Sequence, residues 1–344
     1  MATLVDDVGS FPLPANMDSK LFEEAYRTAR KAIVEGKHLE KDEFLLNSFN
    51  QVVLDSFMKK VEAGLDVVNY PQHYDMHRQL ADTLRESMNE GTYVISQERA
   101  VLPEVQVISG EAKRLCEETG RKVQLRVCMM GPIELYLKEM GSVVHKDILQ
   151  IFAENVKRFA KNSILNSKYA QTVVVSLDEP SFGFRDIFTD RETIHSALET
   201  AFNFDGTTRQ IHLHSPSKIT DLLNVKNIDV LSVEYAASPK NIDSVSKRML
   251  DEADKNVRVG VSRTDINSIM AELYDKGITK PSAEQMVEDE RIMQKRFETA
   301  KAKYGDRMTF TGPDCGLGGW PTQEAAQLLL ARTVKAVKAA TEKL

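Results

Sequence analysis

The sequence predicts an α/β fold, a single (β/α)8 TIM barrel, on three observations. Eight short runs of β-branched and aliphatic residues are spread along the 344 residues, and longer amphipathic stretches separate them. Strands that alternate with helices form a parallel sheet, and eight such units are typical of a closed barrel. A chain of this length suits one barrel, so we expect residues 1–344 to form a single domain. A doubly wound open sheet would usually have fewer strands and a glycine-rich turn after the first.

The predicted strands share a short apolar run bounded by polar residues or glycine. They span residues 3–8, 65–69, 123–130, 172–177, 209–213, 229–233, 257–261 and 307–311. The segment 147–167 is typical of the helices between them, because its apolar residues recur at helical spacing. These residues are Ile148, Ile151, Phe152, Val156, Phe159 and Ile164.

Two connections depart from this simple alternation. Residues 16–64, after the first strand, contain two helical segments that break around residues 36–38. Residues 91–107, after the second strand, contain Tyr93, Ile95 and Val101 in an alternation that is typical of half-buried strands. We therefore expect a small insertion after strand 2, in the form of a β-hairpin.

The composition excludes several classes of protein. With 42% hydrophobic and 28% charged residues, the chain is expected to be an ordinary soluble globular protein. Its formal net charge of -6 argues against nucleic acid or an anionic membrane as a partner. No apolar run has transmembrane length, no signal-peptide pattern is present, and Cys116, Cys128 and Cys315 do not form a disulfide framework. We therefore expect a reducing, cytoplasmic location.

Polar residues follow the predicted strands at their carboxyl ends, where barrel enzymes build their active sites. Cys315 follows the eighth strand, just before a glycine-rich turn. Other strand ends carry Gly9 with Ser10, Gln72, Asp178 with Glu179, His212 with His214, and Glu234. A histidine, a glutamate and a cysteine form a mixed N/O/S set, which suits zinc better than calcium or magnesium.

Each of these residues also has an ordinary structural explanation. An isolated cysteine is more often a small buried apolar residue than a metal ligand. His212 and His214 lie two residues apart on one face of a strand, so we expect His212 to be a hydrogen-bonded core histidine. Asp178 and Glu179 could simply cap the following helix. The metal site is predicted from the combination of the three ligand types at neighbouring strand ends, not from any one residue.

An ordered set of motifs runs through the chain from about Asp7 to Ala339. It comprises Val8-Gly9-Ser10-Phe11-Pro12, Gly131-Pro132, Asp178-Glu179-Pro180, His214, Glu234 and Pro313-Asp314-Cys315-Gly316-Leu317. This set resembles the cobalamin-independent methionine synthase family, and more narrowly its short archaeal-type members, which contain only the catalytic C-terminal barrel. The resemblance implies a methyltransferase of methionine biosynthesis that methylates the thiol of homocysteine. It also implies a Zn²⁺ ion, which ionises a coordinating thiol and so prepares it for attack on a methyl group.

The resemblance also assigns roles to individual residues. The residues that it assigns to zinc are His214, Glu234 and Cys315. The residues that it assigns to homocysteine are Asp178 for the ammonium group, Ser10 with the Gly9 backbone for the carboxylate, and Gln72 near an amino-acid-binding position. Asp178 is the one residue among them with an expected catalytic role.

Two departures from the family pattern bear on the chemistry. The family usually has a cysteine two residues after the ligand histidine, and here Pro216 follows His214, which leaves three protein ligands. Three ligands with an open position still suit a catalytic zinc. Asn267 stands where the folate-using members have a catalytic histidine, and an amide does not relay a proton in the same way. Together with the short chain, this favours a methylcorrinoid (methylcobalamin or a corrinoid protein) over methyl-folate as methyl donor.

Two other functions remain open at the level of sequence. One is a related barrel enzyme that acts on another thiol such as coenzyme M, or that has decarboxylase-like porphyrin chemistry. Asp178 argues for an amino-acid thiol, since coenzyme M would call for a basic residue facing its sulfonate. The other is a non-catalytic paralogue that kept the barrel and lost the metal, a reading that Pro216 favours.

Overall fold

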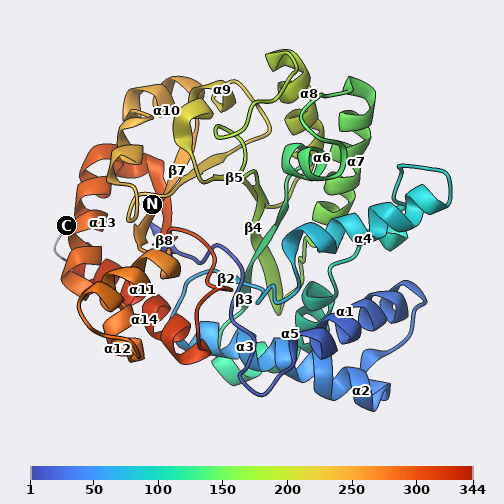
Figure 1. Cartoon of the computed structure of the whole chain (residues 1–344), viewed down its shortest axis with the longest axis horizontal. Coiled ribbons are helices and arrows are strands. Elements are labelled where there is room, and N and C mark those ends of the chain that lie inside the picture. The colour runs from blue at the N-terminus through green and yellow to red at the C-terminus, as the bar shows by residue number, and fades with distance from the viewer. Residues whose placement is uncertain (1, 343–344) are drawn as a thin grey trace.

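The computed structural model describes residues 2–342 and places the strands in one closed parallel sheet, with helices around the outside (Figure 1). This is the predicted (β/α)8 barrel. The strands in the described residues are β1 Leu4–Val5, β2 Val68–Asn69, β3 Val123–Met130, β4 Ala170–Asp178, β5 Thr208–Leu213, β6 Val230–Val233, β7 Asn256–Ser262 and β8 Met308–Pro313. Each lies within three residues of its predicted bounds, and β3 matches them.

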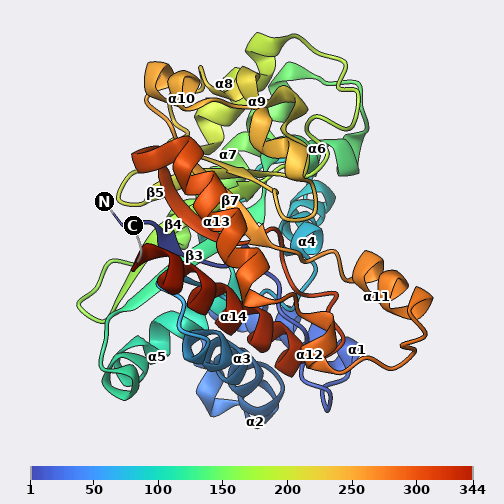
Figure 2. The same cartoon turned by 90° about the vertical axis from the view of Figure 1, so that its left-hand side faces the viewer.

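The helices follow the strands in the expected alternation, with α13 and α14 side by side along one flank (Figure 2). Their bounds in the described residues are α1 Ser19–Val34, α2 Glu43–Leu45, α3 Gln51–Glu62, α4 Met76–Asn89, α5 Pro103–Thr119, α6 Pro132–Met140, α7 Lys146–Asn162, α8 Arg191–Ala201, α9 Ile219–Leu222, α10 Lys247–Ala253, α11 Ile266–Asp275, α12 Ala283–Met286, α13 Glu290–Tyr304 and α14 Gln323–Thr341. None of these helices is long and apolar enough to cross a membrane.

The sheet closes between its first and second strands. The strand order is β1-β8-β7-β6-β5-β4-β3-β2, and a parallel bridge between Asp6 and Val67 joins the two ends. The amides of Asp66 and Val67 donate to the carbonyl of Val5 across the same junction. All strands are therefore parallel neighbours, and their carboxyl ends meet at one mouth.

Side chains from alternate strands fill the inside of the barrel in layers, as is usual for this fold. The lowest layer is apolar: Val67, Val174, Val230 and Phe310 come from β2, β4, β6 and β8 or the residue just before, and they pack together. This layer is separate from the larger cluster that packs the helices against the outside of the sheet. The end of the barrel opposite the mouth is thus closed by a buried apolar layer.

The next layer is charged, which is unusual in a barrel core that aliphatic residues normally fill. Asp6 of the β1 end accepts hydrogen bonds from Arg126 of β3 at 2.6 Å and from Arg258 of β7 at 2.7 Å. Gln210 of β5 completes the layer when its amide oxygen is oriented toward the Arg126 guanidinium. All four side chains are buried. Two guanidinium groups thus share one carboxylate, and the layer carries a positive charge beneath the mouth.

The insertion after β2 differs from the prediction in form. Residues 90–102 contain the short 3-10 turn Gln97–Arg99 and no strand, so the expected hairpin is wrong. Asn155 of α7 takes the place of a partner strand, because its amide accepts from the Ile95 N–H and donates to the Tyr93 carbonyl. The alternating apolar residues reflect a loop packed on α7. The additional length of the β2–β3 connection lies in this loop and in two helices, α4 and α5.

Candidate metal centre

Four side chains with metal-binding atoms meet at the barrel mouth. His212 and His214 come from the end of β5, Glu234 directly follows β6, and Cys315 follows β8. One ligand atom from each of the four lies within 4.8 Å of the others. The structure therefore brings together the three predicted ligands, and it adds His212.

The distances between these atoms suit a single small cation. The His214 Nε2 atom lies 3.5 Å from the Cys315 sulfur and 3.7 Å from Glu234 Oε1. The His212 Nε2 atom lies 3.9 Å from the same Glu234 oxygen. Four donors around a tetrahedral ion with bonds of roughly 2.0–2.3 Å are about 3.3–3.8 Å apart. These three pairs lie at or close to that spacing, and since the remaining pairs lie within 4.8 Å, the donors would move closer together to share one ion.

His212 carries the clearest sign of a missing partner. Its Nδ1 atom lies 3.1 Å from the Ser232 hydroxyl, while its Nε2 atom is buried and has no hydrogen-bond partner among the described residues. A buried polar atom without a partner costs about 1–3 kcal/mol. If Nδ1 carries the proton and donates it to Ser232, Nε2 presents its lone pair to the cluster. A cation there would satisfy this nitrogen.

The electrostatics of the cluster point the same way. Burial, with the neighbouring Asp314 carboxylate, raises the pKa of Glu234 to about 8. Burial, with the Glu234 carboxylate nearby, raises the pKa of Cys315 as well. Burial lowers the pKa of both His212 and His214. Near pH 7 the cluster thus holds its acids protonated and its imidazoles neutral, and a divalent cation would displace these protons.

The hydrogen bond from His212 Nδ1 to the Ser232 hydroxyl gives a first test. The variant Ser232→Ala should weaken metal binding about 10- to 100-fold, the usual effect of removing a group that orients a ligand histidine. The affinity is read by competition with a chromophoric chelator. Ser176→Ala is the matched control, since Ser176 is also a buried barrel serine and donates to Asp178 rather than to the cluster. Equal zinc affinity of the Ser232 variant and the wild type would show that this hydrogen bond does not orient a ligand.

The turn that carries Cys315 is attached to the turn after β1. The Ser10 hydroxyl accepts from the Gly318 N–H at 3.1 Å, and the Ser10 carbonyl accepts from the Leu317 N–H at 2.7 Å. A β-carbon on Gly316 would lie 2.4 Å from the Ser10 hydroxyl oxygen, so only glycine permits this approach. The predicted substrate contact Ser10 and the predicted ligand Cys315 therefore belong to one rigid unit.

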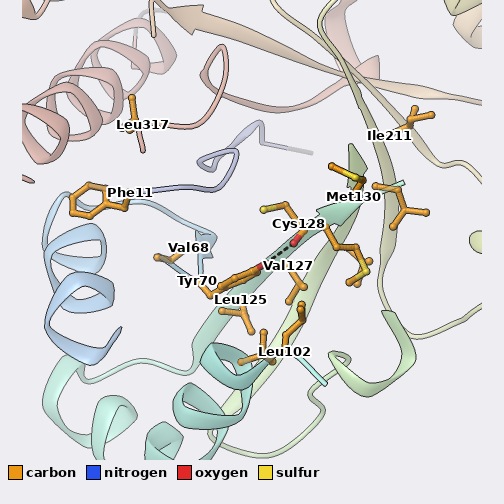
Figure 3. Close-up of a cluster of buried hydrophobic side chains, with 14 of the residues drawn as sticks. Phe11, Val68, Tyr70, Leu102, Leu125, Val127, Cys128, Met130, Ile211 and Leu317 are labelled. Carbon is orange, nitrogen blue, oxygen red and sulfur yellow. Dashed lines mark hydrogen bonds between the residues drawn. The ribbon is translucent and has the colours of Figure 1, made fainter. Parts of the chain in front are cut away.

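The other predicted substrate residues, Gly9 and Gln72, lie against each other. A β-carbon on Gly9 would be 2.9 Å from the Gln72 amide oxygen and 2.7 Å from the Cys128 sulfur. Gln72 has a φ of 45°, a left-handed conformation that non-glycine residues rarely adopt and that often marks a functional site. Its amide is buried and donates to the Tyr70 hydroxyl at 3.1 Å. That hydroxyl in turn donates to the Cys128 carbonyl at 2.7 Å (Figure 3).

A buried ion pair supports the Gly9 turn from below. The Lys60 ammonium of α3 lies 2.5 Å from the Asp7 carboxylate and donates to the Gly9 carbonyl at 2.8 Å. Asp7 also accepts from the Asn69 N–H at the end of β2. Since all three contacts are buried, they fix the β1 turn relative to β2 and α3. The ammonium and carboxylate neutralise each other here, so this pair does not add net charge to the mouth.

The adjacent acids Asp178 and Glu179 have different surroundings. Asp178 lies opposite His212 on the neighbouring strand and accepts from the Ser176 hydroxyl at 2.8 Å. Burial raises the pKa of Asp178 to about 7, against the attraction of Arg126. Glu179 instead accepts from the first free amides of α6, those of Ile133 and Glu134. Glu179 is thus a helix cap, and Asp178 is the acid next to the cluster.

The structure has neighbours among solved proteins, although no protein-family model and no curated protein matches the sequence. A B12-independent methionine synthase from Shewanella sp. W3-18-1, solved in complex with selenomethionine, has a TM-score of 0.61 at 14% identity, with 99% of each chain covered. A putative vitamin-B12 independent methionine synthase from Listeria monocytogenes has a TM-score of 0.56 at 16% identity. That match covers 97% of this chain and 98% of the other. At these identities, the likeness establishes the shared barrel fold along the whole chain.

Proposed function

We propose that this chain is a zinc-dependent methyltransferase that moves a methyl group to the thiol of homocysteine and so forms methionine. The observation that carries the proposal is the cluster of His212, His214, Glu234 and Cys315 at the mouth, with one buried nitrogen that has no hydrogen-bond partner within residues 2–342. Two imidazoles, a carboxylate and a thiolate form a set that suits zinc. The two structural neighbours, a methionine synthase and a putative methionine synthase, support the same reaction.

His212 changes how the ligand set is matched to the family. The family pattern of a histidine followed two residues later by a cysteine then corresponds to His212 and His214. Pro216, which starts the 3-10 turn Pro216–Lys218, is no longer the position where a ligand is missing. We propose four protein ligands in place of the three expected from the sequence, with Cys315 as the only thiolate among them, and the substrate thiol would take the place of one of the four.

The bound zinc would supply one function, the ionisation of the substrate thiol, because a thiol that coordinates Zn²⁺ loses its proton and becomes nucleophilic. Residues of the chain itself would bind and orient the substrate. Asp178, next to His212, pairs with the ammonium group of the amino acid. Ser10 and the backbone of Gly9 receive its carboxylate, and Gln72 supports that turn through its contact with Gly9. These contacts would hold the sulfur toward the cluster.

The methyl donor that we propose is a methylcorrinoid, free or on a carrier protein. The support comes from Asn267, an exposed residue in the first turn of α11. Its amide stands where folate-using relatives have a histidine that handles a proton, and an amide is a poor general acid or base. The donor is proposed independently of the metal centre, so a different donor would leave the zinc proposal intact.

One purification tests both parts of the proposal. We expect about one zinc per chain by metal analysis, and methionine formation from homocysteine with methylcobalamin as methyl donor. Transfer from methyl-folate but not from methylcobalamin would contradict the proposed donor alone. Folded protein that stays free of metal when zinc is supplied would contradict the enzyme and support the non-catalytic reading.

A further inference from the structure

Asp314, the residue before Cys315, occupies a position that neither the ligand set nor the substrate contacts explain. Its carboxylate accepts three hydrogen bonds from consecutive backbone amides: Tyr235 at 2.9 Å, Ala236 at 3.0 Å and Ala237 at 2.7 Å. Successive N–H groups that converge in this way form an anion-binding nest. Here a side chain from the same protein fills the nest, and that nest begins at the residue after the ligand Glu234.

The barrel is shaped to admit this carboxylate. Asp314 is 1% exposed, and a β-carbon on Gly260 of β7 would lie 2.1 Å from its Oδ1 atom. Asp314 is also held from its own backbone, since its N–H donates to the Ser262 carbonyl at 2.9 Å. The buried Arg258 guanidinium donates to the carbonyl of Pro313, the preceding residue, at 2.9 Å. The carboxylate therefore projects from a fixed point.

We propose that Asp314 is a positioning residue that sets the distance between the metal ligands Glu234 and Cys315. It is bonded covalently to Cys315, and through three hydrogen bonds it holds the segment that follows Glu234. Asn241 secures the same segment by donating to the Glu234 carbonyl at 3.0 Å. Because β6 and β8 are separated in the sheet by β7, no direct strand pairing joins the two ligands. The inference rests on the proposed metal centre and specifies what aligns it.

The proposal predicts an effect on metal affinity that exceeds the effect on folding. In Asp314→Asn the side chain keeps its size, and its oxygen can still accept from two of the amides. Its NH₂ group then faces the third N–H, which leaves two donors in contact. Zinc affinity should fall about 10- to 100-fold, as it does when groups that orient ligands are removed. The zinc affinity of Asp314→Ala should fall at least as far.

The control is Glu199→Gln. The Glu199 carboxylate also accepts from two consecutive backbone amides, those of Lys226 and Asn227, in the connection that leads into β6 from the opposite end of the barrel. Zinc affinity is measured by chelator competition for the wild type and all variants. Hydrogen–deuterium exchange of metal-free protein is measured on a peptide covering 235–237, where the Asp314 variants should exchange faster than the wild type.

The outcomes separate this inference from the proposed function. Faster exchange at 235–237 together with a tenfold or greater loss of zinc affinity, against a change of less than about twofold in Glu199→Gln, supports the inference. Released amides with zinc affinity close to that of the wild type would overturn it, and so would unchanged exchange in Asp314→Asn. A wild-type protein that binds no zinc would contradict the proposed metal centre. In that case Asp314 no longer has ligands to align, and the inference fails with the centre even if the exchange data confirm its hydrogen bonds.

Discussion

Replacing Cys315 with serine is expected to remove zinc binding and methyl transfer together. Cys315 is the only sulfur in the four-residue cluster, so its loss leaves the site without a thiolate. A serine hydroxyl does not ionise near neutral pH and binds zinc weakly in its place. Loss of a direct ligand should exceed the 10- to 100-fold effect of removing an outer-shell group, so we expect affinity to fall by more than about 100-fold. Metal analysis after gel filtration and a methionine-formation assay measure the two effects.

Cys116→Ser provides the matched control for this variant. Cys116 lies on α5, which contributes no residue to the cluster. Its replacement by serine is the same chemical change at a partly exposed site. The Cys116 variant should keep its zinc and its activity. The interpretation of Cys315 as a ligand is wrong if the Cys315→Ser protein retains a full equivalent of zinc with unchanged affinity.

Replacing Asp178 with asparagine should raise the KM for homocysteine by about 100-fold, with a smaller effect on kcat. The asparagine keeps the shape of the side chain and its contact with Ser176, but it cannot neutralise an ammonium group. Breaking a buried charged pair typically costs 2–5 kcal/mol or more. The discriminating substrate is 4-mercaptobutyrate, which is homocysteine without its amino group. The wild type should strongly prefer homocysteine over it, and the variant should lose that preference.

The same variant tests the state of the Asp178 proton. Because burial raises the pKa of Asp178 to about 7, protonation below that pH removes the negative charge that an ammonium group needs. In the wild type, affinity for homocysteine relative to 4-mercaptobutyrate should fall as the pH drops through 7. In Asp178→Asn the ratio should not depend on pH. Asp190→Asn serves as the control, since Asp190 only caps α8, through the Thr193 amide. A wild-type preference that is the same at pH 6 and pH 8 would contradict this assignment.

The fold was largely predictable because parallel barrel strands are buried on both faces. β3 is apolar except for Gln124 and Arg126, and its predicted and observed bounds agree. The two closing strands were less accessible to prediction. The predicted runs at 3–8 and 65–69 are longer than β1 and β2, which pair regularly over only two residues each, and Asp6 and Val67 beside them make a single bridge. The expected hairpin is absent because the side chain of Asn155, distant in sequence, binds the backbone of Tyr93 and Ile95 in place of a partner strand.

The candidate site was predictable as far as barrel topology determines it. The proximity of His214, Glu234 and Cys315 could be predicted because residues at strand ends meet at one mouth. His212 was placed in the core, and its burial and hydrogen bond to Ser232 agree with that. Whether its Nε2 atom has a hydrogen-bond partner depends on residues that are close in space but distant in sequence, and no sequence pattern shows this. The spacing of two residues to His214 was the available signal, and it was equally consistent with a core histidine. Glu179 is a helix cap, but of α6, which precedes it in the chain, and not of the following helix that the sequence suggested.

The closing seam of the barrel has a consequence for how the protein is made. Leu4 and Val5 pair with Phe310 and Thr311, and Asp6 needs both Arg126 and Arg258. Because synthesis proceeds from the amino end, β1 is made long before β8 and cannot form this pairing until residues 310–311 have been synthesised. The hydrogen bond from the Gly318 N–H to the Ser10 hydroxyl likewise forms only after the glycine turn beside Cys315 has been synthesised. Contacts so far apart in sequence form late and slowly. The candidate metal centre is thus completed only after β8 has been synthesised, so any zinc loading is expected to follow synthesis of β8.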